Sequence, residues 1–266
     1  MSVNCETTCQ CLANGHGRWT NNSWQPFYHG NLNINSVNAK SRPRKKRMGH
    51  LWIYGDSSAF HFWNSISKSR LCKEVFQFCN LSYNWIYPYT QASIRKKDDL
   101  DFRPQIVIDL IKQVLCKDEM MGSENVLVLN FGLHYARSVS FEMFKKLVQD
   151  VIVMLHDHKQ QHNNSARVIW KTTTAARKEK QKRYLNHRRF LTEQRVRLFD
   201  AYAMSEMCKA GILVLDVHPL TASYYPGPYD GLHYQHEVFK SAEKELGILA
   251  KAGQNYKTTE VCVADY

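Results

Sequence analysis

Short apolar runs that alternate with long helical segments are the feature that most limits the folds open to this chain. Four such runs lie at residues 51–54, 126–129, 168–170 and 212–215. An apolar run of this length between turn or helix signals is typical of a strand that is buried on both faces. Strand–helix alternation therefore predicts an α/β protein, a three-layer α/β/α sandwich around a mainly parallel sheet.

The segments between and after these runs show helical periodicity, because apolar residues recur every three or four positions. The sets are Phe144, Leu147, Val151 and Met154, then Val196, Phe199, Ala203 and Met207, and last Val238, Ala242, Leu246 and Leu249. With 266 residues, 44% of them hydrophobic, the chain can bury one full core. We expect the folded domain at residues 50–251, after an irregular arm at 1–49 and before a tail at 252–266.

The net charge of +12 bears on possible partners. A basic balance can accompany binding to nucleic acid, membranes or acidic glycans. Here the charges are dispersed and no nucleic-acid-binding module is recognisable, so we expect a solvated basic surface and no nucleic-acid partner. No apolar stretch is long enough to form a transmembrane segment in this chain.

The eight cysteines are compatible with disulfides and an oxidising compartment. Asn-x-Ser sequons at Asn21, Asn80 and Asn163 would matter only in a secreted chain. Although no signal-peptide pattern opens the sequence, we expect the secretory pathway or the extracellular space, with a cytoplasmic setting as the alternative.

The spacing of the cysteines bears on one possible disulfide and on one possible zinc site. If Cys72 and Cys79 lie on one helix, their Cα atoms are about 10 Å apart, too far for a disulfide. Three N-terminal cysteines, Cys5, Cys9 and Cys11, precede His16, but this spacing fits no standard zinc site. We therefore expect no metal and no organic cofactor.

A serine follows the first predicted strand in the tripeptide Gly55-Asp56-Ser57. At a strand-to-helix junction, a serine lies at the edge of the sheet where ligands bind, and its own N–H faces a developing oxyanion. The same tripeptide is also an ordinary turn with a helix cap. The interpretation of Ser57 as a nucleophile therefore depends on finding a base.

The candidate base is His233, in Asp230-Gly231-Leu232-His233 before the last helix. Imidazole takes a serine proton near neutral pH, and a carboxylate fixes the tautomer of the imidazole. Ser57, His233 and Asp230 thus form a candidate catalytic triad. His218, in Asp216-Val217-His218, is an alternative base that we interpret as structural.

Two further histidines lie near these motifs. The segment Gly132-Leu133-His134 follows the strand predicted at 126–129, so the Gly132 backbone or the His134 ring is positioned to donate to an oxyanion. Packing is the alternative role for His134. His61, four residues after Ser57, either lines the site or packs against the core.

Together these motifs resemble the SGNH/GDSL hydrolase superfamily, and more narrowly its PC-esterase branch, which includes polysaccharide and sialate O-acetyltransferases and neurexophilin-and-PC-esterase-domain proteins. The resemblance covers roughly residues 17–250 and rests on the order of Gly55-Asp56-Ser57, Gly132-Leu133-His134 and Asp230-Gly231-Leu232-His233. It is supported by Trp63 with Ser65, by Gly17-Arg18-Trp19 and by Trp24-Gln25-Pro26. It implies a serine-dependent esterase or O-acyltransferase whose substrate is an acylated carbohydrate or another small ester, with acetyl as the acyl group.

The sequence departs from that branch in three places. The missing arginine and glycine favour an alternative, a catalytically decayed binding or adaptor protein on the same fold, whereas the intact triad residues oppose it. Phe60 stands where the branch commonly has an arginine, three residues after the serine. Residues 56–121 contain no glycine, so the usual second-block glycine is absent. Trp24-Gln25-Pro26 also lacks the usual nearby cysteine, with His29 and Gly30 there instead.

Overall fold

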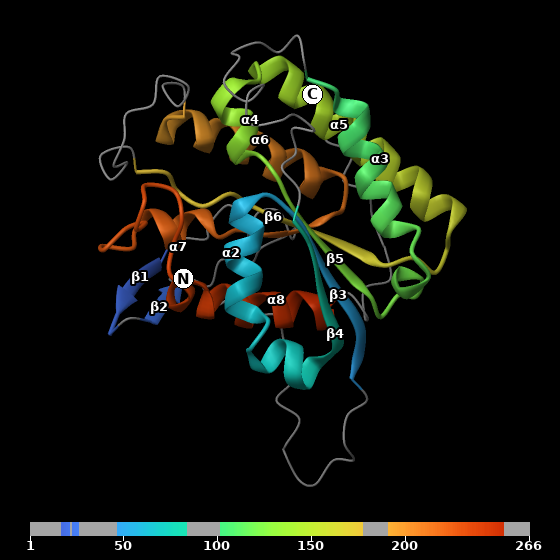
Figure 1. The fold of residues 1–266 in the computed structure, drawn as a ribbon, viewed down its shortest axis with the longest axis horizontal. Coiled ribbons are helices and arrows are strands. Elements are labelled where there is room, and N and C mark those ends of the chain that lie inside the picture. Colours follow the sequence, from blue (N-terminus) through green and yellow to red (C-terminus); the bar gives the residue numbers. More distant parts are fainter. Residues whose placement is uncertain (1–16, 22, 27–46, 84–101, 178–190, 253–266) are drawn as a thin grey trace, which may run out of the picture.

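The centre of the molecule is a five-stranded sheet, seen in a computed structural model that describes residues 17–21, 23–26, 47–83, 102–177 and 191–252 (Figure 1). The strands follow the order β4-β3-β5-β6-β7, and all neighbours are parallel. Their bounds are Met48–Gly55 for β3, Phe76–Tyr83 for β4, Val126–Asn130 for β5, Arg167–Lys171 for β6 and Leu213–Leu215 for β7. All four strands that the apolar runs predict are present, and their carboxyl ends meet at one edge of the sheet.

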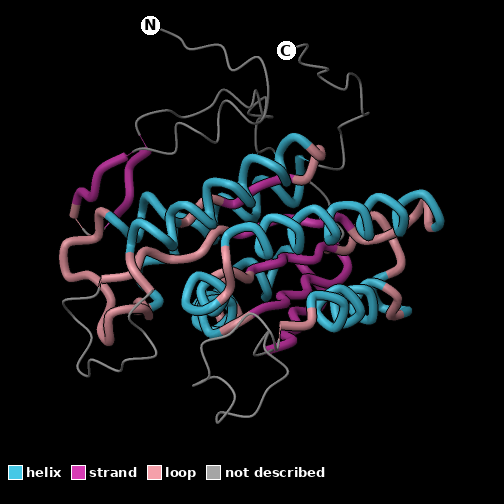
Figure 2. Tube along the Cα trace, turned by 90° about the horizontal axis from the view of Figure 1, so that it is seen from above, coloured by secondary structure: helices cyan, strands magenta, loops and turns pink. Residues whose placement is uncertain are grey.

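Helices cover both faces of this sheet, as the α/β/α prediction requires. Figure 2 shows the strands, in magenta, between the cyan helices. Leu127 and Leu129 of β5 join the core beneath one helical layer, while Val126 and Val128 join the core on the opposite face. The first layer contains α3 (Pro104–Leu115), α4 (Leu133–Ser138), α5 (Phe141–Gln161) and α6 (Glu193–Lys209). The second contains α2 (Ser57–Ile66) and α8 (Lys240–Ala252).

The predicted helical stripes face the core. The stripe residues of α5 and α6 are buried or packed against the first core, and those of α8 are buried in the second. Val238 precedes α8 in a short 3₁₀ turn, η7 (His236–Phe239). Side-chain caps fix where two helices begin: Ser140 Oγ accepts from the Met143 N–H at 3.2 Å, and Thr192 Oγ1 accepts from the Arg195 N–H at 3.2 Å.

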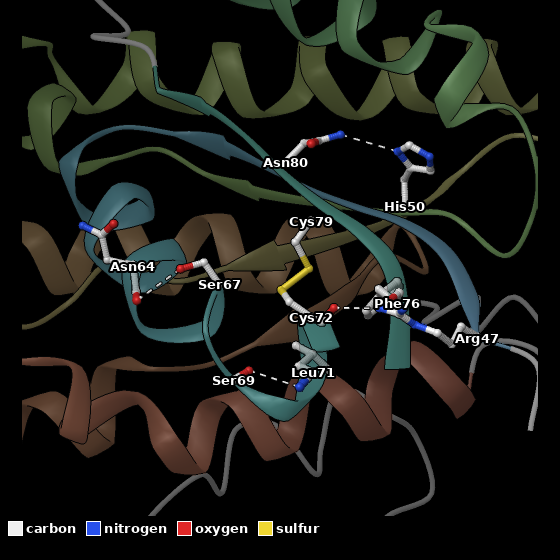
Figure 3. The surroundings of a disulfide bond; sticks show 10 residues. All are labelled: Arg47, His50, Asn64, Ser67, Ser69, Leu71, Cys72, Phe76, Cys79 and Asn80. Carbon is white, nitrogen blue, oxygen red and sulfur yellow. Dashed lines mark hydrogen bonds between the residues drawn. A yellow bond between two sulfur atoms is a disulfide. The ribbon is translucent and has the colours of Figure 1, made fainter. Parts of the chain in front are cut away.

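β4 is a strand that the apolar pattern did not predict. It lies at the edge of the sheet beside β3, and half-exposed polar positions interrupt its apolar ones. Cys79 lies in β4, whereas Cys72 lies in the preceding π-helical turn η1 (Leu71–Val75). A disulfide joins them across a Cα–Cα distance of 5.7 Å (Figure 3). The expectation that these cysteines are too far apart to pair is wrong, because it placed both on one helix.

Part of the segment expected to be irregular forms a β-hairpin. β1 (Gly17–Thr20) pairs antiparallel with β2 (Ser23–Pro26). The indole Nε1 of Trp19 donates to the Leu220 carbonyl at 3.0 Å, and its ring lies 5.0 Å from that of Tyr224. The hairpin is therefore anchored on the region of α7 (His218–Ala222). Within the described residues, no helix combines the length and apolar character needed to cross a bilayer.

Candidate active site

Ser57 lies where β3 ends and α2 begins. A Cβ atom on Gly55 would come within 2.0 Å of the Asn130 carbonyl oxygen, so only glycine allows β3 to approach β5 this closely. Asp56 is the N-cap of α2, and its Oδ1 accepts from the Ser58 N–H at 2.8 Å. Ser57 is thereby fixed as the first residue of the helix, where backbone N–H groups have no partner within the helix.

Ser57, His233 and Asp230 come together as a hydrogen-bonded chain. Ser57 Oγ lies 2.8 Å from His233 Nε2, and His233 Nδ1 lies 2.6 Å from Asp230 Oδ2. Because Nδ1–H donates to the carboxylate, Nε2 is left to accept the serine proton. The structure thus joins one residue at the start of the domain to two that follow 173 and 176 positions later.

Asp230 is held as a carboxylate by three donors. Its Oδ1 accepts from the backbone N–H groups of Leu232 at 3.0 Å and His233 at 2.8 Å, while Oδ2 accepts from the His233 ring. Burial alone would raise the pKa of Asp230, but these hydrogen bonds outweigh it and hold the pKa well below its usual range. The carboxylate is therefore ionised at any pH at which the neutral imidazole can act as a base.

The two candidate oxyanion donors lie at the carboxyl end of β5, beside β3. Gly132 precedes α4 with a φ of +154°, and a Cβ there would meet Thr173 Oγ1 at 3.1 Å. His134 is the second residue of α4 and is half-buried. Both therefore occupy the same edge of the sheet as Ser57.

A buried polar layer that sequence reasoning did not assign to the site lies beneath the Ser57 loop. Lys171 Nζ donates to Asn130 Oδ1 at 3.2 Å and to the Thr172 carbonyl at 3.0 Å. Burial lowers the pKa of Lys171 to about 8, and the charges of Asp56, Asp200 and Asp216 oppose this shift. Burial also raises the pKa of Asp56, against the Ser58 N–H and the Lys171 charge. A lysine at the end of an apolar strand was the available signal.

His218, the alternative base, has different partners. Its Nε2 lies 3.0 Å from Glu193 Oε1, and its Nδ1 lies 3.7 Å from Asp200 Oδ2. Burial raises the pKa of Asp200 to about 7, although the His218 charge lowers it. Burial would lower the pKa of His218, but the Glu193 hydrogen bond and the neighbouring carboxylates reverse that effect and raise it. His218 thus belongs to an acid–base cluster between α6 and α7, and Asp200 of this cluster also acts on the pKa of Lys171.

His61 contacts the candidate base directly. The two imidazole rings are 4.5 Å apart, and the Tyr229 hydroxyl lies 3.3 Å from His61 Nε2. Burial lowers the pKa of His61, and the charge of His233 lowers it further. The ring lines the site in a form that is neutral near pH 7.

The described residues contain no group of three or more His, Cys, Asp or Glu side chains arranged to hold a metal ion. The N-terminal cluster of Cys5, Cys9, Cys11 and His16 lies outside the described residues.

Comparison with known proteins gives a fold. No protein-family model matches the chain, and no curated protein matches its sequence. Among solved structures, a carbohydrate acetylesterase family member from Sinorhizobium meliloti superposes with a TM-score of 0.53 at 12% identity, over 79% of this chain and 100% of that chain. The two proteins therefore share the three-layer α/β/α fold.

A lipase/acylhydrolase from Enterococcus faecalis is also similar, with a TM-score of 0.49 at 14% identity, over 80% of this chain and 100% of that chain.

Proposed function

We propose that this protein is a serine-dependent acyl-ester hydrolase in which Ser57, His233 and Asp230 form the catalytic triad. The observation that carries the proposal is the continuous hydrogen-bonded chain from Ser57 Oγ through His233 to Asp230. The distances in this chain suit a nucleophile, its base and an orienting carboxylate, which supports the proposal.

In the reaction, His233 Nε2 takes the proton of Ser57 as Oγ attacks the carbonyl carbon of the ester. Asp230 stabilises the imidazolium that forms. The tetrahedral intermediate collapses when His233 gives the proton to the leaving alcohol, which departs and leaves an acyl-serine. Water, activated in turn by His233, releases the acid, and an acceptor hydroxyl in place of water would complete an acyl transfer.

The negative oxygen of the intermediate needs hydrogen-bond donors. We assign this role to the backbone N–H groups of Ser57 and Gly132 and to the His134 ring. Their support is their common position at the carboxyl edge of β3 and β5. Each donor aimed at the developing charge typically contributes about 3–4 kcal/mol of transition-state stabilisation.

The finer proposal is that the substrate is an acetyl ester of a carbohydrate and that the setting is the secretory pathway or the extracellular space. The resemblance to PC-esterase proteins supports the substrate class. The disulfide between Cys72 and Cys79 supports an oxidising compartment.

The test is hydrolysis of 4-nitrophenyl acetate by the purified chain and its Ser57→Ala variant. We expect the variant to lose nearly all turnover and to unfold at the same temperature as the parent, because a serine side chain contributes little apolar burial. Ser67→Ala, just beyond the end of α2, is the matched control and should keep full turnover. An inactive parent chain would instead support a binding or adaptor protein on the same fold.

A further inference from the structure

Four aromatic side chains form a continuous row beside Ser57, which we call the aromatic rim: Phe60, His61, Tyr83 and Tyr229. The Phe60 ring lies 5.4 Å from that of Tyr83 and 5.5 Å from that of His61. The His61 ring lies 6.0 Å from that of Tyr229. At its inner end the rim meets the candidate base, since the rings of His61 and Tyr229 lie 4.5 and 6.1 Å from that of His233.

The rim is assembled from three elements that all converge on the nucleophile. Phe60 and His61 lie three and four residues after Ser57, on the same side of α2. Tyr83 ends β4, paired with Gly55, and Tyr229 directly precedes Asp230 in sequence. A group that projects from an ester bound at Ser57 would therefore lie against these rings.

The rim is open to water. The side chains of Tyr83 and Tyr229 are 43% and 48% exposed, and Phe60 and His61 are half-buried. Exposed aromatic rings that cluster beside a reactive group mark a ligand-binding surface. An aliphatic acyl chain would bind more favourably in an enclosed apolar pocket. A half-open aromatic surface suits a ring that has an apolar face and a polar periphery.

The charges that act on the two tyrosines of the rim are negative. Burial raises the pKa of Tyr83 and of Tyr229, and the charges of Asp56 and Asp230, respectively, raise it further. Phe60, whose ring lies between those of Tyr83 and His61, adds no positive charge to the rim. These negative charges disfavour an ester whose alcohol part bears a carboxylate, and they favour one whose alcohol part is uncharged.

We propose that the aromatic rim binds the uncharged pyranose ring that carries the ester, with the C–H face of the sugar against Phe60 and Tyr83. The assignment rests on the proposed esterase function, because it places the scissile ester at Ser57. The sugar hydroxyls remain in water or reach the phenol groups at the rim.

The experiment compares three acetate esters that differ only in the alcohol: ethyl acetate, which has no ring, phenyl acetate, and a neutral methyl pyranoside with one acetyl group. We expect Phe60→Ala and Tyr83→Ala to lower kcat/KM for the acetyl pyranoside about tenfold through KM, as expected when a ring contact is lost. Hydrolysis of ethyl acetate should stay unchanged. Phe78→Ala removes an exposed aromatic ring from the same strand as Tyr83 and should change none of the three.

The outcomes separate the two proposals. Equal losses of kcat/KM on ethyl acetate and on the acetyl pyranoside would refute the proposal that the rim binds the sugar. The same loss of kcat/KM in Phe78→Ala would also refute it. A loss of kcat/KM confined to phenyl acetate would show that the rim binds an aryl group and not a sugar. If the parent chain cleaves none of the esters, the esterase proposal fails. NMR titration of the parent and of Phe60→Ala with methyl pyranoside then tests sugar binding by the rim independently of catalysis. Weaker binding in Phe60→Ala would support it, and identical binding would refute it.

Discussion

Replacing Asp230 by asparagine tests the triad at the residue whose role is the most specific. Asparagine keeps an oxygen that can accept from the Leu232 and His233 backbone N–H groups, which Asp230 Oδ1 now does at 3.0 and 2.8 Å. Its amide nitrogen, however, would face His233 Nδ1 as a donor, where a carboxylate oxygen now accepts at 2.6 Å. Nδ1 must then become an acceptor, so the proton moves to Nε2 and the ring can no longer take the serine proton.

We expect Asp230→Asn to lower kcat on 4-nitrophenyl acetate by about 10⁴ at neutral pH, the loss that a wrong histidine tautomer causes in a serine triad. This corresponds to about 5–6 kcal/mol of transition-state free energy. The fold should survive, because both backbone hydrogen bonds are kept. Asp109→Asn on α3, where Asp109 accepts from exposed Gln105, is the control and should keep full activity. A kcat within tenfold of the parent would refute the role of Asp230.

Three other changes probe the site and its support. His134→Ala should lower kcat by about 10²–10³ with little change in KM, and His134→Asn should recover part of this loss, because the amide restores an N–H donor; steady-state kinetics of both variants will decide. Gly55→Ala should lower the free energy of unfolding by roughly 2–4 kcal/mol in urea, since its Cβ would lie 2.0 Å from the Asn130 carbonyl oxygen. Burial lowers the pKa of Lys171 from 10.5 to about 8, so between these values the unfolded chain binds more protons and stability rises with pH. From pH 8 to pH 10 the parent should therefore gain about 2 kcal/mol over Lys171→Met in urea unfolding, and equal changes in both proteins would contradict this assignment.

The sheet and the candidate triad could be predicted from sequence because each depends on a local pattern. Buried parallel strands are apolar throughout, as in β5, and a motif at the end of such a strand must lie at the carboxyl edge of the sheet. Ser57 was assigned to this edge on these grounds, and His233 was assigned to it because its motif precedes the last helix. The 2.8 Å contact between Oγ and Nε2 agrees with that expectation.

Features that depend on contacts between distant segments could not be predicted in the same way. β4 is an edge strand with half-exposed polar positions, so it lacks the apolar run that identified its neighbours, and the Cys72–Cys79 pairing was missed with it. Lys171 directly follows the apolar run at residues 168–170. Its contact with Asn130 arises only because β5 and β6 are neighbours in the sheet, and the clustering of His218 with Glu193 likewise needs the tertiary fold.

The most direct test of the central claim is covalent labelling of the purified chain with a fluorophosphonate, followed by mass spectrometry of the intact protein and of its peptides. A fluorophosphonate reacts with a serine that a neighbouring base has activated. The account predicts a single adduct, located on Ser57, that is absent from Ser57→Ala and forms far more slowly in His233→Ala. An unlabelled parent chain, or an adduct on another residue, would contradict the triad of Ser57, His233 and Asp230.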